Sequence, residues 1–250
     1  MEQAKPKVYA IVTARGGSKS IPKKNIKEIC GKPLIAWTIE AAKRARNIDR
    51  LICDTDNEEI AAIAKEYGAE IPFMRPAELA EDLTPDLPVF VHAVKWLGEH
   101  EGVTPDAVVH LRPTGPMRTT EDIEAAIDLL LAHPEADSVR CVAEAPLHPL
   151  KTYTLGADNY LTPFIPESVS GMKEPYNLPR QALPKAYASL AYLSVIWSRT
   201  ISEQNSMTGK RFLGQIVPFE NTVDINDPVD FEVARVVLAK RLEKMGLAAK

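Results

Sequence analysis

The sequence predicts an α/β protein built on a mostly parallel sheet with helices on both faces. Three observations lead to this prediction. Short apolar runs recur along the first half of the chain, most of them are followed by a segment with helical spacing of apolar residues, and the first run ends in a loop that contains glycine. Repeated strand–helix units of this kind form parallel sheets that are covered on both faces.

The predicted strands of the first half are five short apolar runs. Each is bounded by a turn signal or a helical segment, which is typical of buried strands. In chain order they cover residues 8–13, 50–53, 69–73, 107–111 and 138–142. Ligands in such sheets bind beyond the carboxyl ends of the strands, so the loops that follow these strands are the expected place for a site.

The predicted helices of the first half lie between these strands. Proline suits the first position of a helix, asparagine suits the N-cap, and glycine suits the residue after the end. The helices are expected from Pro33, from the Asn57 cap to Tyr67 before Gly68, from about Asp86 to Glu99, and from Thr120.

The second half of the chain has a different pattern. Residues from about 144 to 186 are rich in proline and turn residues, so we interpret them as an excursion from the main sheet, with strand candidates at 151–155 and 160–165. Strand signals return at 187–197 and 215–219, and a final helix carries Phe231, Ala234, Val237 and Leu238 at helical spacing.

Length and composition agree with a single domain over residues 1–250. The chain is 45% hydrophobic and 26% charged, which is ordinary for a globular protein, and its net charge of −4 disfavours a nucleic-acid binder. Cys30, Cys53 and Cys141 are isolated, so we expect buried thiols in a reducing compartment. The first residues lack a signal-peptide pattern and no run is long enough to span a membrane, so we expect a cytoplasmic protein with no membrane partner.

The most informative segment is the loop after the first strand, residues 14–25. Gly16 and Gly17 allow backbone N–H groups to turn inward and bind an anion. Four cations, Arg15, Lys19, Lys23 and Lys24, stand within ten residues of an otherwise acidic chain. We predict polyphosphate binding, with a solvated basic loop as the alternative. The loop has neither the P-loop pattern nor the dinucleotide fingerprint, which disfavours a P-loop NTPase and a nicotinamide dehydrogenase.

A second candidate site is the acidic segment around Asp224. In an extended segment the side chains of Asp224 and Asn226 share one face, and oxygen ligands of this kind suit Mg²⁺ together with substrate phosphates. The alternative is a helix N-terminus, since Asp227 followed by Pro228 is a good capping pair. Both interpretations are compatible, with Asp227 as the cap and Asp224 as the metal ligand.

Other candidates lie in loops that follow predicted strands. Arg112 and Arg118 follow the fourth strand and could reach anionic groups, although two prolines there also fit a simple turn. The segment 54–56 follows the second strand and could be only a helix start. The pair Arg180–Gln181 could bind a carboxylate. The five histidines have no common spacing, so no histidine-based metal site is expected.

Taken together, these segments resemble the acylneuraminate cytidylyltransferases, the CMP-sialic acid synthetase family. The resemblance runs nearly from end to end, and the first loop, the stretch RPAELA and the stretch RQALP are its most specific parts. The matching segments are Ala14–Asn25, Gly31–Leu34, Asp54–Asp56, Arg75–Ala80, Arg112–Pro116, His148–Lys151, Arg180–Pro184 and Asp224–Ile225.

The resemblance implies a Rossmann-like nucleotidyltransferase that transfers CMP from CTP to the anomeric hydroxyl of an acidic 2-keto-3-deoxy sugar, with Mg²⁺ as cofactor. It implies a homodimer in which the excursion carries residues to the partner's active site. The catalytic residues would be Arg15, Lys24 and Asp224. The nucleotide would contact Ala14, Arg15, Gly16, Gly17, Ser18, Lys19, Lys24, Asn25 and Arg75. The sugar would contact Arg112, Thr114, Lys151, Arg180 and Gln181, and the metal Asp224 and Asn226.

The chain also departs from the family pattern. Arg112 replaces a glutamine and Gly115 a serine, Asn226 replaces the second aspartate of the metal motif, and Leu190 and Ala191 replace an Asn–Gly pair that contacts the sugar. Arg112 predicts an additional anionic or hydroxyl acceptor near the sugar. Loss of a polar contact shifts discrimination between substrates. The alternatives are therefore a nucleotide-binding relative with impaired catalysis, or a transferase for another base or another acidic sugar such as an octulosonate.

Overall fold

The computed structural model describes residues 5–189 and 191–247. Its central sheet follows the order β11-β6-β10-β5-β1-β4, and β9 pairs with β6 beside this path. The strands are β1 (Val8–Thr13), β4 (Arg50–Asp54), β5 (Ala107–Leu111), β6 (Ser138–Glu144), β9 (Tyr187–Ala188), β10 (Leu193–Trp197) and β11 (Phe212–Ile216). Strand β1 is parallel to β4 and β5, and β11 is parallel to β6, whereas β10 is antiparallel to β5 and β6. The prediction of a mostly parallel sheet is confirmed.

Several helices begin at a side chain that caps them. The Asn57 side chain accepts a hydrogen bond from the Ile60 N–H, and Gly68 ends that helix at a φ of 102°. Asp227 and Asp230 form a capping box at the last helix. The helices are α1 (Leu34–Lys43), α2 (Glu58–Tyr67), α3 (Asp86–Glu101), α4 (Thr120–Ala132), α5 (Glu167–Ser170), α6 (Ser198–Ser202) and α7 (Pro228–Lys244).

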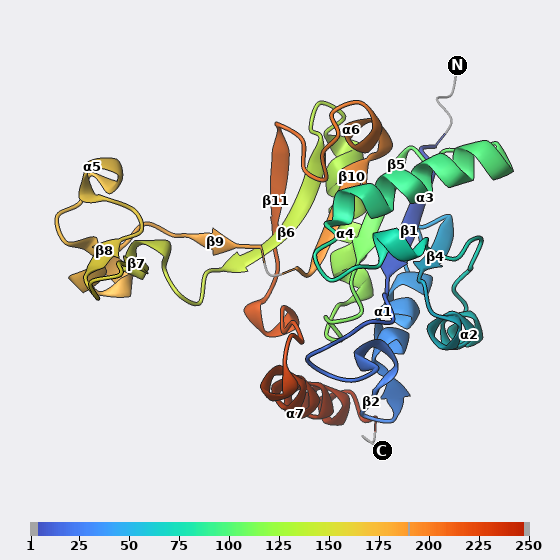
Figure 1. The fold of residues 1–250 in the computed structure, drawn as a ribbon, viewed down its shortest axis with the longest axis horizontal. Helices are drawn as coiled ribbons and strands as arrows, with labels where there is room; N and C mark the ends of the chain where they lie inside the picture. The colour runs from blue at the N-terminus through green and yellow to red at the C-terminus, as the bar shows by residue number, and fades with distance from the viewer. Residues whose placement is uncertain (1–4, 190, 248–250) are drawn as a thin grey trace.

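The alternating side chains of β1 show that both faces of the sheet are buried. Val8, Ala10 and Val12 pack in one cluster with apolar residues of α1, α2 and α4, while Ile11 packs on the opposite face with residues of α3 and α6. Helix α7 forms a separate cluster with Ile21 and neighbouring residues of the chain after β1. This packing fixes the loop after β1 between the sheet and α7 (Figure 1).

Residues 145–186, which we call the arm, extend away from the body of the molecule (Figure 1). The arm leaves the sheet at the end of β6 and returns through β9. It contains the hairpin of β7 (Tyr153–Leu155) and β8 (Leu161–Pro163) together with α5. Several of its large apolar side chains face solvent: Tyr160 is 76% exposed and Phe164 66% exposed.

Three details differ from the expectations. Residues 69–73 do not form a strand; only Glu70 bridges to Ile52, and Pro72 has no N–H to extend the pairing. The last strand lies at 212–216 and not at 215–219, ending before Pro218. The expected strand 187–197 consists of β9 and β10, two strands in different places of the sheet.

The remaining expectations concern thiols, the first hairpin and membrane spans. Cys53 and Cys141 are buried as expected, but Cys30 is half-buried. Cys30 lies in the left-handed region, at a φ of 49°, in the turn between β2 (Glu28–Ile29) and β3 (Lys32–Pro33). No helix within the described ranges is long and apolar enough to cross a membrane.

Candidate functional site

A cavity of about 500 Å³ opens where the parallel strands β1 and β5 end. The loop after β1, the segment from Arg75 to α3 and the loop after β5 line it. This is the edge of the sheet at which ligands bind in such folds. Of the residues expected to contact substrate, the structure brings these to the cavity: Arg15, Ser18, Lys19, Lys24, Asn25, Arg75, Arg112 and Thr114.

The loop after β1 is held by contacts of its own backbone. The Asn25 side chain donates to the Arg15 carbonyl at 2.9 Å, and the Gly16 N–H donates to the Asp56 carboxylate at 2.8 Å. A Cβ at Gly16 would lie 2.9 Å from the Asn57 side chain, which explains the glycine. In this structure the Gly16 N–H is therefore bonded to a carboxylate. Ala14 is fully buried, so its side chain is part of the core.

The cations of this loop meet a carboxylate that the sequence did not point to. Arg15 donates to Asp82 at 2.7 Å, and Lys19 forms a second ion pair with the same carboxylate. Hydrogen bonds from Lys19 and then Arg15 hold the pKa of Asp82 below its usual value. Lys23 points elsewhere and pairs with Glu59 at 2.6 Å. The cavity is therefore cationic on one wall, with Asp82 occupying part of it.

Lys24 connects this loop to the acidic segment before α7. Its ammonium donates to the Ile225 carbonyl at 2.8 Å, and the Ile225 N–H donates to the Thr114 carbonyl at 3.0 Å. Burial lowers the pKa of Lys24, and the neighbouring Asp224 opposes this shift. The three segments expected to form the site are thus joined by hydrogen bonds.

Asp224 and Asn226 lie together, as expected for alternating residues of an extended segment. The Asn226 amide donates to Asp224 Oδ2 at 3.2 Å, while Asp224 Oδ1 is buried and has no hydrogen-bond partner among the described residues. These two residues line a neighbouring cavity of about 370 Å³ and not the cavity of Arg15. Within the described residues no three His, Cys, Asp or Glu side chains group as a metal site.

Arg75 is fixed by a buried ion pair. Its Nε donates to Asp54 Oδ1 at 2.7 Å, and its Nη2 donates to the Asp54 carbonyl at 2.9 Å. Burial raises the pKa of Asp54, and the charge of Arg75 opposes this effect. The segment 54–56 therefore does more than start a helix, since Asp54 orients Arg75 at the cavity and Asp56 holds the loop at Gly16.

The two arginines after β5 have different roles. Arg112 forms an ion pair with Asp86 at the cavity wall. Arg118 is 4% exposed and donates to the Tyr192 carbonyl, the Thr38 hydroxyl and the Arg112 carbonyl. Burial lowers the pKa of Arg118 to about 10. The expectation that Arg118 reaches a ligand anion is wrong, because its donors are used by the protein's own oxygens.

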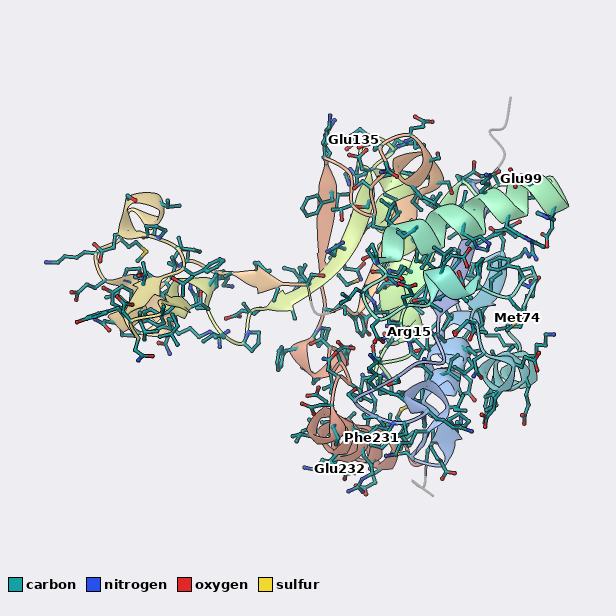
Figure 2. All side chains as sticks on the ribbon, viewed as in Figure 1. Arg15, Met74, Glu99, Glu135, Phe231 and Glu232 are labelled. Atoms are coloured by element: carbon teal, nitrogen blue, oxygen red, sulfur yellow. The ribbon has the colours of Figure 1, made fainter. Side chains whose placement is uncertain are left out.

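The expected sugar-binding residues of the arm lie far from this cavity within one chain. Figure 2 shows Arg15 in the body, well separated from the arm. Lys151 donates to the carbonyls of Tyr176 and Leu178, at 3.0 and 2.6 Å. Arg180 donates to Glu144 at 2.9 Å, and Gln181 is exposed. None of these three residues lines the cavity.

The position of the missing Asn–Gly pair is described only in part. Leu190 lies outside the described residues. Ala191 has a φ of 54°, in the left-handed region that favours glycine. The backbone at Ala191 therefore has the conformation for which the family's glycine is suited, although the side chain differs.

Known proteins are similar to this chain in sequence. The family model described as "Cytidylyltransferase" matches residues 9–150, more than half of the chain. A pseudaminic acid cytidylyltransferase of Campylobacter jejuni is 27% identical over 231 residues, which are 92% of this chain and 96% of that relative. A CMP-N,N'-diacetyllegionaminic acid synthase of Legionella pneumophila is 37% identical over 123 residues, about half of each chain (49% and 53%).

A solved structure supports the fold independently of sequence. It is that of a CMP:2-keto-3-deoxy-manno-octonic acid synthetase complexed with CTP, with a TM-score of 0.66 over 94% of this chain and 100% of that one. Its sequence identity of 14% shows the fold alone. The match to the family model assigns the protein to a family. It covers residues 9–150, which include the loop after β1, Arg75 and the loop after β5. The chain belongs to the cytidylyltransferase family, whose members are nucleotidyltransferases.

Proposed function

We propose that this chain transfers CMP from CTP to the anomeric hydroxyl of an acidic 2-keto-3-deoxy sugar of the nonulosonic class, and that pyrophosphate leaves. The observation that carries the proposal is the convergence of Arg15, Lys19 and Lys24 around one cavity at the carboxyl ends of β1 and β5. The relatives named above act on pseudaminic and legionaminic acids. This supports a nonulosonic sugar as the acceptor.

In this proposal the cations bind and stabilise the triphosphate. Transfer of a nucleotidyl group depends mostly on positioning and on stabilising the charge of the leaving pyrophosphate. Arg15 and Lys19 reach the cavity as a pair, and Lys24 stands deeper beside Ile225. A triphosphate entering here replaces Asp82 as the partner of Arg15 and Lys19. Arg75 and Asn25 line the same cavity and are our candidates for contacts with the cytidine.

We propose Mg²⁺ as the cofactor, held by Asp224. The fit rests on Asp224 Oδ1, which is buried and has no hydrogen-bond partner among the described residues, because a buried carboxylate oxygen without a donor favours a cation and Mg²⁺ prefers oxygen ligands. Asn226 directs its N–H toward Asp224, so it orients the carboxylate here and would ligate only if its amide turned over. When bound, Mg²⁺ would neutralise phosphate charge.

We also propose a homodimer formed through the arm. The arm exposes large apolar side chains on an extended hairpin, and a second copy is the natural cover for such a surface. Lys151, Arg180 and Gln181 lie in the arm. In this proposal they contact the sugar in the partner's site.

The proposal is tested by pyrophosphate release with CTP, Mg²⁺ and a panel of nonulosonic and octulosonic acids. Turnover on a nonulosonic acid, with CTP preferred over UTP and GTP, is the expected result. Folded protein that releases no pyrophosphate with any acceptor would overturn it. In that case calorimetry with CTP separates a catalytically impaired nucleotide-binding relative, which still binds CTP, from a protein with another ligand.

A further inference from the structure

Three adjacent strands each carry one polar residue, and the strand register places the three side by side. His110 of β5 pairs with Ser194 of β10, which in turn pairs with Arg140 of β6. Residues in register on neighbouring strands point to the same face, so the three side chains form a polar row across the sheet. The row lies on the α3 face, where the His110 ring packs 4.7 Å from the Phe90 ring.

This row lines a small cavity of about 130 Å³ that is separate from the cavity of Arg15. The two cavities share Asp86 and Arg112 as lining residues, so this ion pair forms the wall between them. The volume corresponds to roughly four waters at about 30 Å³ each, which is enough for a carboxylate but not for a sugar ring. A carboxylate in the small cavity could therefore be one end of a molecule whose larger part lies beyond Arg112.

The small cavity carries an uncompensated positive charge. Arg112 is paired with Asp86, and burial lowers the pKa of His110 to about 3, so its imidazole is neutral. Arg140 donates to the Thr208 hydroxyl at 2.8 Å, and among the described residues that line the cavity the only carboxylate is Asp86, which is paired with Arg112. A half-buried guanidinium without a counter-charge favours binding of an anion, and its planar donors match a carboxylate.

We propose that this cavity is a subsite for the carboxylate of the acceptor sugar, with Arg140 as its cationic donor and Ser194 as a second donor. The inference rests on the proposed function. In a 2-keto acid the carboxylate is bonded to the anomeric carbon, so a carboxylate behind Arg112 places the anomeric hydroxyl at the boundary with the nucleotide cavity. Lys151 donates to a carbonyl of the arm and Arg180 pairs with Glu144 of β6, whereas Arg140 donates to a neutral hydroxyl.

The first test compares Arg140→Gln and Arg140→Lys with a matched control, Arg44→Gln, which removes one exposed positive charge away from both cavities. Arg140→Gln is expected to raise the KM for the acidic sugar by about ten- to hundredfold, the loss of one charged hydrogen bond, with the KM for CTP unchanged. Arg140→Lys should recover part of this loss. Equal changes in both KM values, or none, would overturn the subsite.

The second test uses the sugar acid and its carboxamide, and measures binding by calorimetry in the presence of CMP. The wild type and Arg180→Gln should prefer the acid, whereas Arg140→Gln should bind both alike. If the preference survives in Arg140→Gln, the carboxylate lies elsewhere. If no acceptor is turned over but acid binding depends on Arg140, the subsite stands and the proposed reaction fails. If neither acid nor carboxamide binds to any variant, both proposals fail.

Discussion

At the scale of single residues, the proposed phosphate binding depends on which cations of the loop after β1 line the cavity. Arg15 lines it and Lys23, only eight residues later, does not. Arg15→Ala is expected to lower turnover by about a hundredfold or more, since it removes a donor to developing negative charge. Stability should change by less than about 1 kcal/mol because its ion pair is exposed. Initial rates and thermal unfolding measure the two effects.

Lys23→Ala is the matched control for Arg15→Ala. It removes the same charge from the same loop but breaks only the exposed contact with Glu59, so activity should stay close to that of the wild type. Similar losses in both variants would mean that the loop acts through its general charge and not through Arg15.

The buried position of Lys24 predicts that activity falls at alkaline pH. Its pKa is lowered by burial, so in the free enzyme the ammonium loses its proton below the usual value of 10.5 as pH rises. The charged form is the one that binds phosphate, so kcat/KM for CTP should fall as pH rises through this lowered pKa. Lys24→Arg keeps its charge throughout that range and should move the fall to higher pH. An unchanged pH profile in Lys24→Arg would assign the fall to another group.

A substitution of Asn226 tests whether this residue can bind the proposed metal. Asn226→Asp replaces the amide donor 3.2 Å from Asp224 Oδ2 by a second carboxylate. If residue 226 can ligate Mg²⁺, the Mg²⁺ concentration for half-maximal pyrophosphate release should decrease, because the two carboxylates share the ion. A dependence on Mg²⁺ that does not move would show that residue 226 only orients Asp224.

At the scale of elements, the strands and helices that the sequence predicts correctly are those with local signals. The apolar run Val8–Thr13 and the caps Asn57 and Asp227 act over a few residues, so their elements are found where expected. One missed feature depends on pairing between distant segments. The insertion of β10 between β5 and β6 aligns Ser194 with two other polar residues, which no periodicity reveals.

The same reasoning explains why part of the site was missed. Asp82 shows no pattern in the sequence, yet the fold of the segment between Arg75 and α3 brings it onto Arg15 and Lys19. Arg118, in contrast, has the residue type and position of an anion ligand, but the backbone of Tyr192 takes its donors. Residue type and position after a strand therefore predict which loops form the site, and not which side chains are free.

The contacts of Asp82 with Arg15 and Lys19 predict that Asp82 competes with CTP for these two cations. Asp82→Asn removes a charge that the triphosphate must displace, so the KM for CTP should fall by about two- to tenfold, in the range expected for exposed ion pairs. Glu78→Gln, an exposed change in the same segment, should leave the KM as it is. A higher KM in Asp82→Asn would show that Asp82 helps to bind CTP or to order the loop.

At the scale of the whole molecule, the body and the arm divide the expected functions. The body holds the cavity and its cations, whereas the arm holds Lys151 and Arg180 and exposes apolar side chains such as Leu155 and Leu161. One chain cannot bring these parts together in the arrangement seen in Figure 2. The proposed second copy would account for both features, since it would bury the apolar surface and meet the arm's polar residues.

Because the body and the arm carry different residues, two variants can test whether the site is shared between two chains. Arg15→Ala damages the body and Arg180→Ala the arm, and each alone is expected to lower turnover. If the arm completes the partner's site, a homodimer reassembled from both variants forms some sites with Arg15 from one chain and Arg180 from the other. After random exchange about half of the dimers are mixed, each with one intact site of two, so about a quarter of wild-type activity should return.

Leu155→Asp in both chains, which charges the exposed arm surface, should abolish the recovery and shift the mass in light scattering from dimer to monomer. A mixture no more active than its components, in protein shown to be dimeric, would mean that each chain holds a complete site.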